Sequence, residues 1–455
     1  MSQPADIADL LRCPACAGAP LARTQDAWRC ASCGAAYPEV CAIPFLFAEP
    51  TLALGEWRLR LQRLLAELRH EAALQRDALA RASSARTRSR LKIKAAGLED
   101  HARRLGALLA PLGVDGPAPT LEAHRALGTP LPEAQGLAAY YVNAHRDWCW
   151  GTEENEAGLA AVTAALGGWR PDRVLVLGSG AGRLAYDLHQ RLGPHTTVAL
   201  DINPLFAILS RRIFSGESVE LYEFPVAPRD AESQAILRRL AAESPAHPGL
   251  TVVLGDAARA PFLPGAFDLV VTPWLIDVMD VDFAVFAGQV NALLSDGGRW
   301  VNTGSLSFAD ADPARQYGLD EVTAIVGAAG FATPALAEQR VPYLCSPASR
   351  HGRLETVVTF AAVRESAAPA VAPAPVPAWL ERTDVPVPAL PAYQSSALAM
   401  RVYGFVASLI DGRRSVADIA QVLVAERLMT ADSAPAAVLG FLQRLHADAR
   451  RRDRF

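Results

Sequence analysis

Short apolar runs, each ending in a turn that contains glycine or aspartate, dominate the middle of the chain. Residues 174–177 are four apolar residues in a row, and residues 197–200, 250–254 and 267–272 are also mostly apolar. Such runs are typical of strands buried on both faces of a parallel sheet. Residues 183–192 read as a helix, and a fifth strand is expected after a Gly-Gly turn. The alternation predicts an α/β domain with a largely parallel sheet.

A glycine-rich turn joins the first predicted strand to the first helix. Gly178, Gly180 and Gly182 would let a ligand approach bare backbone N–H groups at the start of that helix. Asp201 ends the second strand, roughly 20 residues further on, where an acid can bond ribose hydroxyls. Asp256 ends the third strand. The alternative is an NAD-binding domain, but those usually carry Gly-x-Gly-x-x-Gly, and here the third glycine comes one residue early.

Five of the seven cysteines fall within the first 41 residues. Two Cys-x-x-Cys knuckles can bring four thiolates together tetrahedrally, as structural Zn²⁺ prefers. A redox dithiol is the alternative, but it would not need the second knuckle. We therefore predict a zinc ribbon over residues 1–50, and expect that Cys13→Ser loses zinc but leaves a distant cofactor site able to bind. The predicted ligands are Cys13, Cys16, Cys30 and Cys33.

Residues 51–135 are expected to form a helical arm followed by a Gly- and Pro-containing linker. Apolar residues at helical spacing give one buried stripe on the first helix. A basic run at 86–94 could meet RNA phosphate, although a solvated helix face is the alternative. Residues 366–391 are rich in Ala, Pro and Val and predict a stiff linker. Residues 392–455 then form a small helical domain, with Ser415 as a helix N-cap.

Composition narrows the class of protein. The chain has 455 residues, a net charge of −4, 51% hydrophobic and 20% charged residues. This balance gives no general attraction to nucleic acid or membranes. Neither a signal peptide nor a membrane span is expected, and clustered thiols fit a reducing compartment, so we predict a cytoplasmic protein.

The strand-and-turn series resembles class I S-adenosylmethionine (SAM) methyltransferases, and residues 136–365 would form that domain. The resemblance implies that the glycine turn faces the methionine end, that Asp201 holds the ribose and that Asp256 holds the adenine amine. It also places Ala257 and Pro273 against the cofactor. The cysteine knuckles, with Tyr37-Pro38 and the apolar residues that follow, resemble the zinc-ribbon activator subunit of tRNA and protein methyltransferases.

Several ordered blocks resemble the carnosine N-methyltransferase family. The Arg-Asp-Trp segment at 146–148, the Arg-Leu after the glycine turn, the Ile-Asp at 276–277 and the Trp-Val-Asn-Thr-Gly strand at 300–304 match it. The resemblance implies that Arg146 and Arg183 contact SAM, and that Asp277 lies close to the nitrogen that receives the methyl group. Trp274 would wall the substrate pocket. A helix N-cap is the alternative role for Asp277.

Departures from that family change the expected substrate. Ala309 stands where the family has a histidine that helps bind the imidazole substrate, and Arg353 stands near the family's substrate tyrosines. Carnosine is therefore not the expected acceptor, and Arg353 would suit a carboxylate or phosphate.

The last domain resembles PqqD-like winged-helix modules, which bind leader peptides, on the sequence Leu-Ile-Asp-Gly-Arg-Arg-Ser-Val-Ala-Asp-Ile-Ala. A helical docking domain without a peptide ligand is the alternative. The chain is thus expected to be an N-methyltransferase for a peptide or a small peptide-like molecule, with a leader peptide or a partner protein at its C-terminal domain. A non-catalytic docking scaffold and an RNA methyltransferase are the alternative functions.

Overall fold

The computed structural model describes residues 7–18, 20–25, 27–116, 137–309, 312–368, 379, 384–389 and 391–452. The chain divides into two compact units, Met1–Pro373 and Ala374–Phe455. The predicted linker at the end of 51–135 lies outside the described residues from 117 to 135, and so does much of 366–391.

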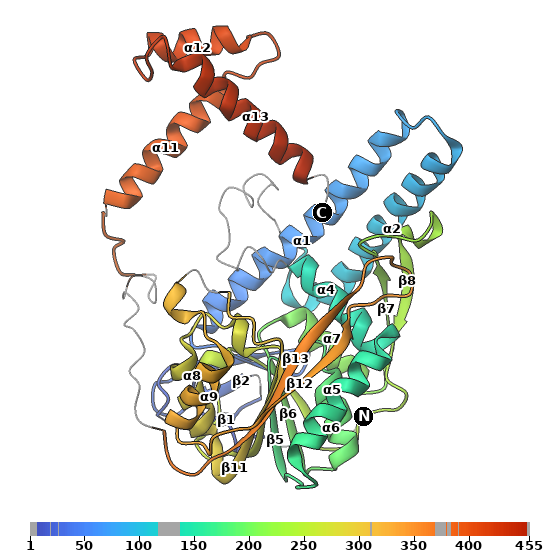
Figure 1. Cartoon of the computed structure of the whole chain (residues 1–455), viewed down its shortest axis with the longest axis vertical. Coiled ribbons are helices and arrows are strands. Elements are labelled where there is room, and N and C mark those ends of the chain that lie inside the picture. Colours follow the sequence, from blue (N-terminus) through green and yellow to red (C-terminus); the bar gives the residue numbers. More distant parts are fainter. Residues whose placement is uncertain are drawn as a thin grey trace. The chain divides into compact units, whose positions relative to one another are not determined.

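A mostly parallel sheet forms the centre of the first unit (Figure 1). Its order is β9-β6-β5-β10-β11-β13-β12, and only β13 runs against its neighbours. This doubly wound arrangement confirms the predicted Rossmann-like α/β fold, with the change of winding direction between β5 and β10. The strands are β5 (Arg173–Leu177), β6 (Thr196–Asp201), β9 (Leu250–Gly255), β10 (Phe267–Pro273), β11 (Leu294–Gly304), β12 (Leu336–Tyr343) and β13 (Arg353–Val363).

Alternate residues of each strand enter two different cores. Val174 and Val176 of β5 pack in one core with the arm, whereas Leu175 and Leu177 pack in the other with the ribbon. Both faces are buried, which explains why these strands read as unbroken apolar runs. Helices α5 (Thr152–Leu166), α6 (Arg183–Leu192) and α7 (Pro204–Phe214) contribute to the first core, and α8 (Phe283–Leu293) and α9 (Leu319–Ala328) to the second.

The N-terminal ribbon extends this sheet and is not a separate body. Its strand β4 pairs in parallel with β9, with Phe45 opposite Leu254 and Leu46 opposite Gly255. The expectation of a ribbon distant from the cofactor site is therefore wrong, because Gly255 directly precedes Asp256. The ribbon strands are β1 (Leu21–Arg23), β2 (Ala27–Cys30), β3 (Ala36–Val40) and β4 (Ile43–Leu46).

Two long helices form the arm: α1 (Pro50–Leu79) and α2 (Ala85–Leu109), which pack against each other. The apolar stripe of α1 is buried at Trp57, Leu61 and Leu64, as its spacing predicts. The segment before α5 consists of α4 (Leu137–His145) and a π-helical turn at Arg146–Trp150. The hairpin β7 (Val219–Glu223) and β8 (Ile236–Leu240) follows α7, and short 3₁₀ turns cover Ala110–Leu112, Glu232–Gln234, Ala257–Arg259, Ile276–Val278 and Pro313–Arg315.

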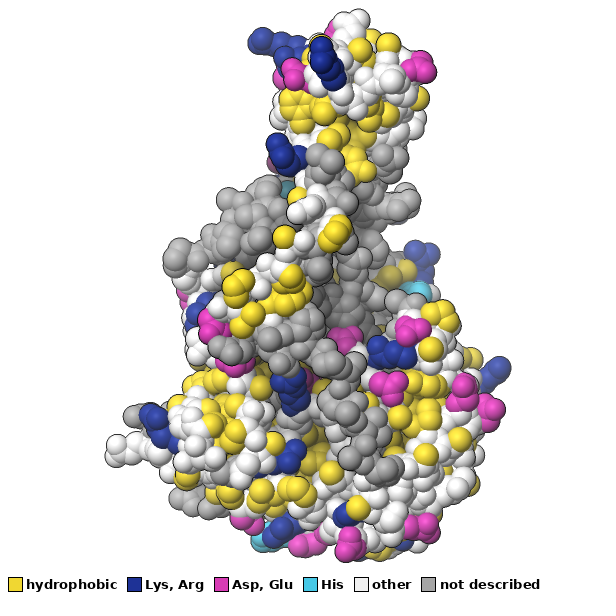
Figure 2. All heavy atoms as spheres, turned by 90° about the vertical axis from the view of Figure 1, so that its left-hand side faces the viewer, with side chains coloured by type: hydrophobic (Ala, Val, Ile, Leu, Met, Phe, Trp, Pro, Cys, Tyr) yellow, Lys and Arg dark blue, Asp and Glu magenta, His cyan; other side chains and the backbone are white. Residues whose placement is uncertain are grey.

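The second unit contains α11 (Pro391–Ser408), α12 (Val416–Ala425) and α13 (Ala434–Arg452). Ser415 caps α12 and accepts a hydrogen bond from the Asp418 N–H, as predicted. No strand occurs among the residues described in this unit, so the winged-helix assignment stays a prediction. Apolar side chains such as Met400 and Tyr403 are exposed in this unit. Figure 2 shows hydrophobic side chains gathered on the face of the molecule that it views. None of the helices described in either unit is long and apolar enough to cross a membrane.

Candidate functional site

The glycine turn and Asp201 form one hydrogen-bonded unit at the carboxyl edge of the sheet. Asp201 Oδ2 accepts the Gly180 N–H at 2.7 Å, and Oδ1 accepts the Asn203 N–H at 2.8 Å. Gly182 has φ +87°, and a Cβ there would lie 2.7 Å from Phe214 and Ser210, so its role is helix packing. A Cβ at Gly180 would meet no atom within 4 Å. The turn thus presents open backbone beside a fixed carboxylate.

Burial raises the pKa of Asp201 to about 6, although the N–H groups of Asn203, Gly180 and Ile202 oppose the shift. At neutral pH the carboxylate is ionised, and its lone pairs remain available to hydroxyl donors. Asp256, which directly follows β9, is partly buried, and this burial raises its pKa. Its Oδ1 accepts the Ala258 N–H at 2.8 Å, so this carboxylate too has a fixed orientation.

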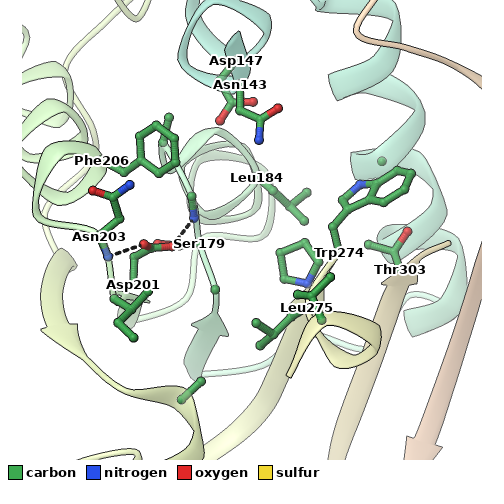
Figure 3. A pocket seen from close by; sticks show the side chains of 18 of the residues that line it. Asn143, Asp147, Ser179, Leu184, Asp201, Asn203, Phe206, Trp274, Leu275 and Thr303 are labelled. Carbon is green, nitrogen blue, oxygen red and sulfur yellow. Dashed lines mark hydrogen bonds between the residues drawn. The ribbon is translucent and has the colours of Figure 1, made fainter. Parts of the chain in front are cut away.

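A single cavity of about 620 Å³ unites most of the predicted site residues. This volume is typical of small-molecule sites, and the cavity lies where doubly wound sheets bind ligands. In Figure 3, Asp201 and Asn203 lie on one side, Trp274 and Thr303 on the other, and Asn143 and Asp147 above. The predicted residues that line the cavity are Arg146, Gly178, Gly180, Asp201, Asp256, Ala257, Pro273, Trp274, Asp277 and Arg353.

Asp277 and Trp274 shape the side of the cavity opposite Asp201. Asp277 Oδ2 accepts hydrogen bonds from Ser305 Oγ at 2.6 Å and from the Ser307 N–H at 2.8 Å. This anchoring fixes the carboxyl group while its second oxygen has no partner among the hydrogen bonds of the described residues. Trp274 has φ +51°, and its backbone N–H donates to the Thr303 carbonyl oxygen at 2.8 Å. Non-glycine residues held in this region are strained and concentrate at functional sites.

The β12–β13 hairpin forms a wall beyond Trp274. Three cross-strand pairs line the cavity: Gln339 with Val357, Val341 with Glu355, and Tyr343 with Arg353. The Tyr343 ring lies 4.7 Å from the Trp274 ring and 4.6 Å from the Arg353 guanidinium carbon. The Arg353 side chain is 57% exposed and pairs with Glu355. The wall is therefore uncharged at the Gln339–Val357 end and carries the Arg353–Glu355 ion pair towards the other end.

The Arg-Asp-Trp segment forms the π-helical turn, a geometry often found at functional sites. Arg146 Nε donates to Asp147 Oδ1 at 2.5 Å, and Nη1 pairs with Glu154. Arg183 does not line the cavity: it pairs with Asp187 at 2.7 Å and donates to Asp147 O at 3.1 Å. Arg183 therefore contacts two residues that line the cavity, and it holds the backbone of Asp147.

The four predicted metal ligands converge in the ribbon. The Sγ atoms of Cys13, Cys16, Cys30 and Cys33 all lie within 4.8 Å of one another. The pairs Cys13–Cys33 and Cys16–Cys30 are 3.6 Å apart. Four thiolates at about 2.3 Å from a tetrahedral Zn²⁺ lie about 3.8 Å apart, so this donor set fits zinc. Tyr37 Oη lies 3.0 Å from Cys13 Sγ and would orient that ligand.

Sequence reasoning did not assign several residues that line the cavity. Trp57 and Arg60 come from the arm, Glu154 comes from α5, and Tyr343 comes from β12. No motif marks these residues, because their place depends on how distant segments pack. For Trp57 the only sequence signal is its place in the apolar stripe, which also describes an ordinary core residue.

No model of a known protein family matches the chain, and no curated protein matches it in sequence. Solved structures resemble about half of it. They include Haemonchus contortus phosphoethanolamine N-methyltransferase 2 with phosphomonomethylethanolamine and S-adenosylhomocysteine (15% identity, TM-score 0.33, 50% of this chain and 57% of that one). A Haloferax volcanii protein in complex with the Trm112 methyltransferase activator also matches (14% identity, TM-score 0.33, 50% of this chain and 96% of that one). The N-methyltransferase NodS of Bradyrhizobium japonicum with S-adenosylhomocysteine matches as well (13% identity, TM-score 0.31, 50% of this chain and 99% of that one). The matched region spans 57% of the length of the Haemonchus enzyme.

Proposed function

We propose that the protein is a SAM-dependent methyltransferase that acts on a nitrogen atom. One observation carries this proposal: a single cavity joins the open glycine turn and the two acidic residues at strand ends, Asp201 and Asp256, to an anchored carboxylate, Asp277. The first group of residues suits a nucleoside ligand, and the second suits an acceptor with N–H donors.

The residues of the cavity fit SAM in their donor and acceptor types. Asp201 would accept the ribose hydroxyls, and Asp256 the adenine amine. Asn143 Oδ1 is buried without a partner in the described structure and lines the cavity, so it can accept from an ammonium group. SAM supplies an electrophilic methyl group when it is bound. The task left to the chain is to place an acceptor lone pair behind that methyl group and to exclude water.

Asp277 is the residue that we assign to the acceptor. The hydrogen bonds from Ser305 and Ser307 hold one of its oxygens, which leaves the other to accept an N–H of the substrate. Such a contact orients the nitrogen and takes up or relays the proton that it loses, which contributes about 10²- to 10⁴-fold in comparable general-base reactions. Trp274 would form the wall behind the acceptor.

The substrate class follows from the β12–β13 wall. Its length of three cross-strand pairs suits an elongated acceptor, and Arg353 at its charged end suits a carboxylate or phosphate on that molecule. A peptide or a small peptide-like amine has this form. We further propose that the ribbon binds structural zinc and that the C-terminal unit docks a leader peptide or a partner protein. None of the seven cysteines forms a disulfide, which supports our proposal of a cytoplasmic location.

Two measurements test the function. Calorimetry with S-adenosylhomocysteine tests the cofactor site, and binding should be stoichiometric. Incubation of the protein with cell extract and isotopically labelled SAM, followed by mass spectrometry, should then show a labelled amine. Binding of S-adenosylhomocysteine without any labelled product would favour the non-catalytic docking scaffold. Labelled RNA would show that the acceptor is RNA and not a peptide-like amine. Absence of binding would refute the proposal.

A further inference from the structure

Three arginines line the cavity within the described residues, and they differ in how far their charge is already neutralised. Arg146 pairs with two carboxylates, those of Asp147 and Glu154. Arg353 pairs with Glu355 and is mostly exposed to solvent. Among the ion pairs of the described residues, Arg60 has one partner, Glu56. Of the three, only Arg60 combines a buried side chain with a single carboxylate partner.

The Arg60 side chain is deeply buried, with 10% of its surface exposed. Its Nη2 binds Glu56 one turn earlier on α1, and its guanidinium carbon lies 5.0 Å from the Trp57 ring. Its Nε is buried and finds no acceptor in the described parts of the chain. A buried donor of a charged group is costly to leave unpaired. The arrangement therefore implies an acceptor supplied by a ligand.

Burial lowers the pKa of Arg60, and the Glu56 carboxylate opposes that shift. An additional anion would compensate the loss of hydration. A guanidinium presents its N–H donors as a planar fork, which matches a carboxylate.

We propose that Arg60, supplied by the helical arm, binds the carboxylate at the amino-acid end of the methyl donor. This inference rests on the proposed function, since it requires SAM in the cavity. Asn143 gives a second reason, because its unpartnered Oδ1 lines the same cavity and can accept from the neighbouring ammonium group. Arg146, which the family resemblance assigns to the cofactor, is already held by Asp147 and Glu154. The arm would thus complete the cofactor site from outside the α/β domain.

Calorimetry with two ligands tests this assignment on the full-length protein. S-adenosylhomocysteine carries the carboxylate, and 5′-methylthioadenosine lacks the whole amino-acid end. Arg60→Gln should lower the affinity for S-adenosylhomocysteine by about tenfold or more, as expected for a lost charge-assisted hydrogen bond. The affinity for 5′-methylthioadenosine should stay within twofold of the wild type. Arg60→Lys should give an intermediate loss, because it keeps the charge and loses the fork.

Two control variants separate ligand binding from helix stability. Glu56→Gln breaks the same ion pair but frees Arg60, so it should keep or strengthen S-adenosylhomocysteine binding. Arg63→Gln removes the neighbouring ion pair with Glu67, which has a length of 2.9 Å and lies outside the cavity. It should change the affinity for neither ligand.

Equal affinity of wild type and Arg60→Gln for S-adenosylhomocysteine would overturn the inference. So would an equal loss for both ligands, which indicates a structural role. If Arg60→Gln does not fold, Arg60→Lys still decides, because lysine can keep the ion pair with Glu56 and a purely structural ion pair therefore predicts unchanged binding of S-adenosylhomocysteine. A wild-type protein that binds neither ligand would refute the proposed function itself.

Discussion

Asp201→Asn probes the proposed ribose contact with the smallest change in shape. In the wild type both carboxylate oxygens already accept backbone N–H groups, from Gly180 and Asn203. The amide keeps one acceptor oxygen, so one of these N–H groups loses its partner, and the negative charge disappears. We expect loss of cofactor affinity from a protein that remains folded.

Two effects on stability oppose each other in this variant. The rise in pKa from 3.8 to about 6 corresponds to a penalty of about 3 kcal/mol on the ionised, buried Asp201. Because the folded-state pKa lies above the unfolded one, this penalty is present at neutral pH and disappears as the pH falls through about 6 towards 4. Asp201→Asn removes it, whereas the unpaired N–H costs about 1–3 kcal/mol. The unfolding free energy should therefore change by about 2 kcal/mol or less.

Cofactor affinity should fall much more clearly. Hydroxyl hydrogen bonds to a carboxylate contribute about 1.5–3 kcal/mol, so we expect a loss of about 10- to 100-fold for S-adenosylhomocysteine at pH 7. In the wild type, protonation of Asp201 should lower affinity below pH 6, to about one tenth at pH 5. Asp201→Asn should show a flatter profile, with the remaining slope due to Asp256, whose pKa is also raised by burial.

Calorimetry between pH 5 and 7 and thermal denaturation provide the assay. Asp268→Asn is a matched control, since Asp268 also accepts two backbone N–H groups, those of Asp172 and Arg173, at the opposite edge of the sheet. The control should bind S-adenosylhomocysteine as the wild type does. Affinity of Asp201→Asn within twofold of the wild type at pH 7, or an unchanged pH profile, would refute the role of Asp201.

Three further predictions concern the acceptor side and the ribbon. Asp277→Ala should keep SAM affinity within a few-fold and lower the rate of labelled-product formation by about 100-fold or more, and unchanged turnover would remove Asp277 from the mechanism. Gly304→Ala places a Cβ 3.1 Å from the Trp274 backbone, so turnover should fall about tenfold, with a smaller change in S-adenosylhomocysteine affinity; equal rates would show that Trp274 does not position the acceptor. Cys13→Ser should lose zinc, which elemental analysis measures, and retained stoichiometric zinc would contradict the four-thiolate site. The variant should also bind S-adenosylhomocysteine several-fold more weakly, because β4 pairs with β9, the strand directly before Asp256.

Local sequence patterns determined the fold of the central domain. Helix α6 covers the expected residues, and β5, β6, β9 and β10 agree with the predicted runs to within a residue or so. Such strands are easy to recognise because both faces are buried, and the glycine turn is recognisable because it needs positive φ angles. Cys13, Cys16, Cys30 and Cys33 were predictable for a similar reason, since the spacing within each knuckle is itself the geometric requirement.

The tertiary structure alone decided which distant segments share the cavity. Arg183 follows the glycine turn directly, yet it pairs with Asp187 and does not line the cavity itself, whereas Arg60, far away in the sequence, does. The ribbon reads as a separate module, but β4 continues the central sheet because β9 would otherwise present an open edge. Strand and helix periods depend on neighbouring residues, but contacts between elements depend on packing and edge pairing, which leave no fixed spacing along the chain.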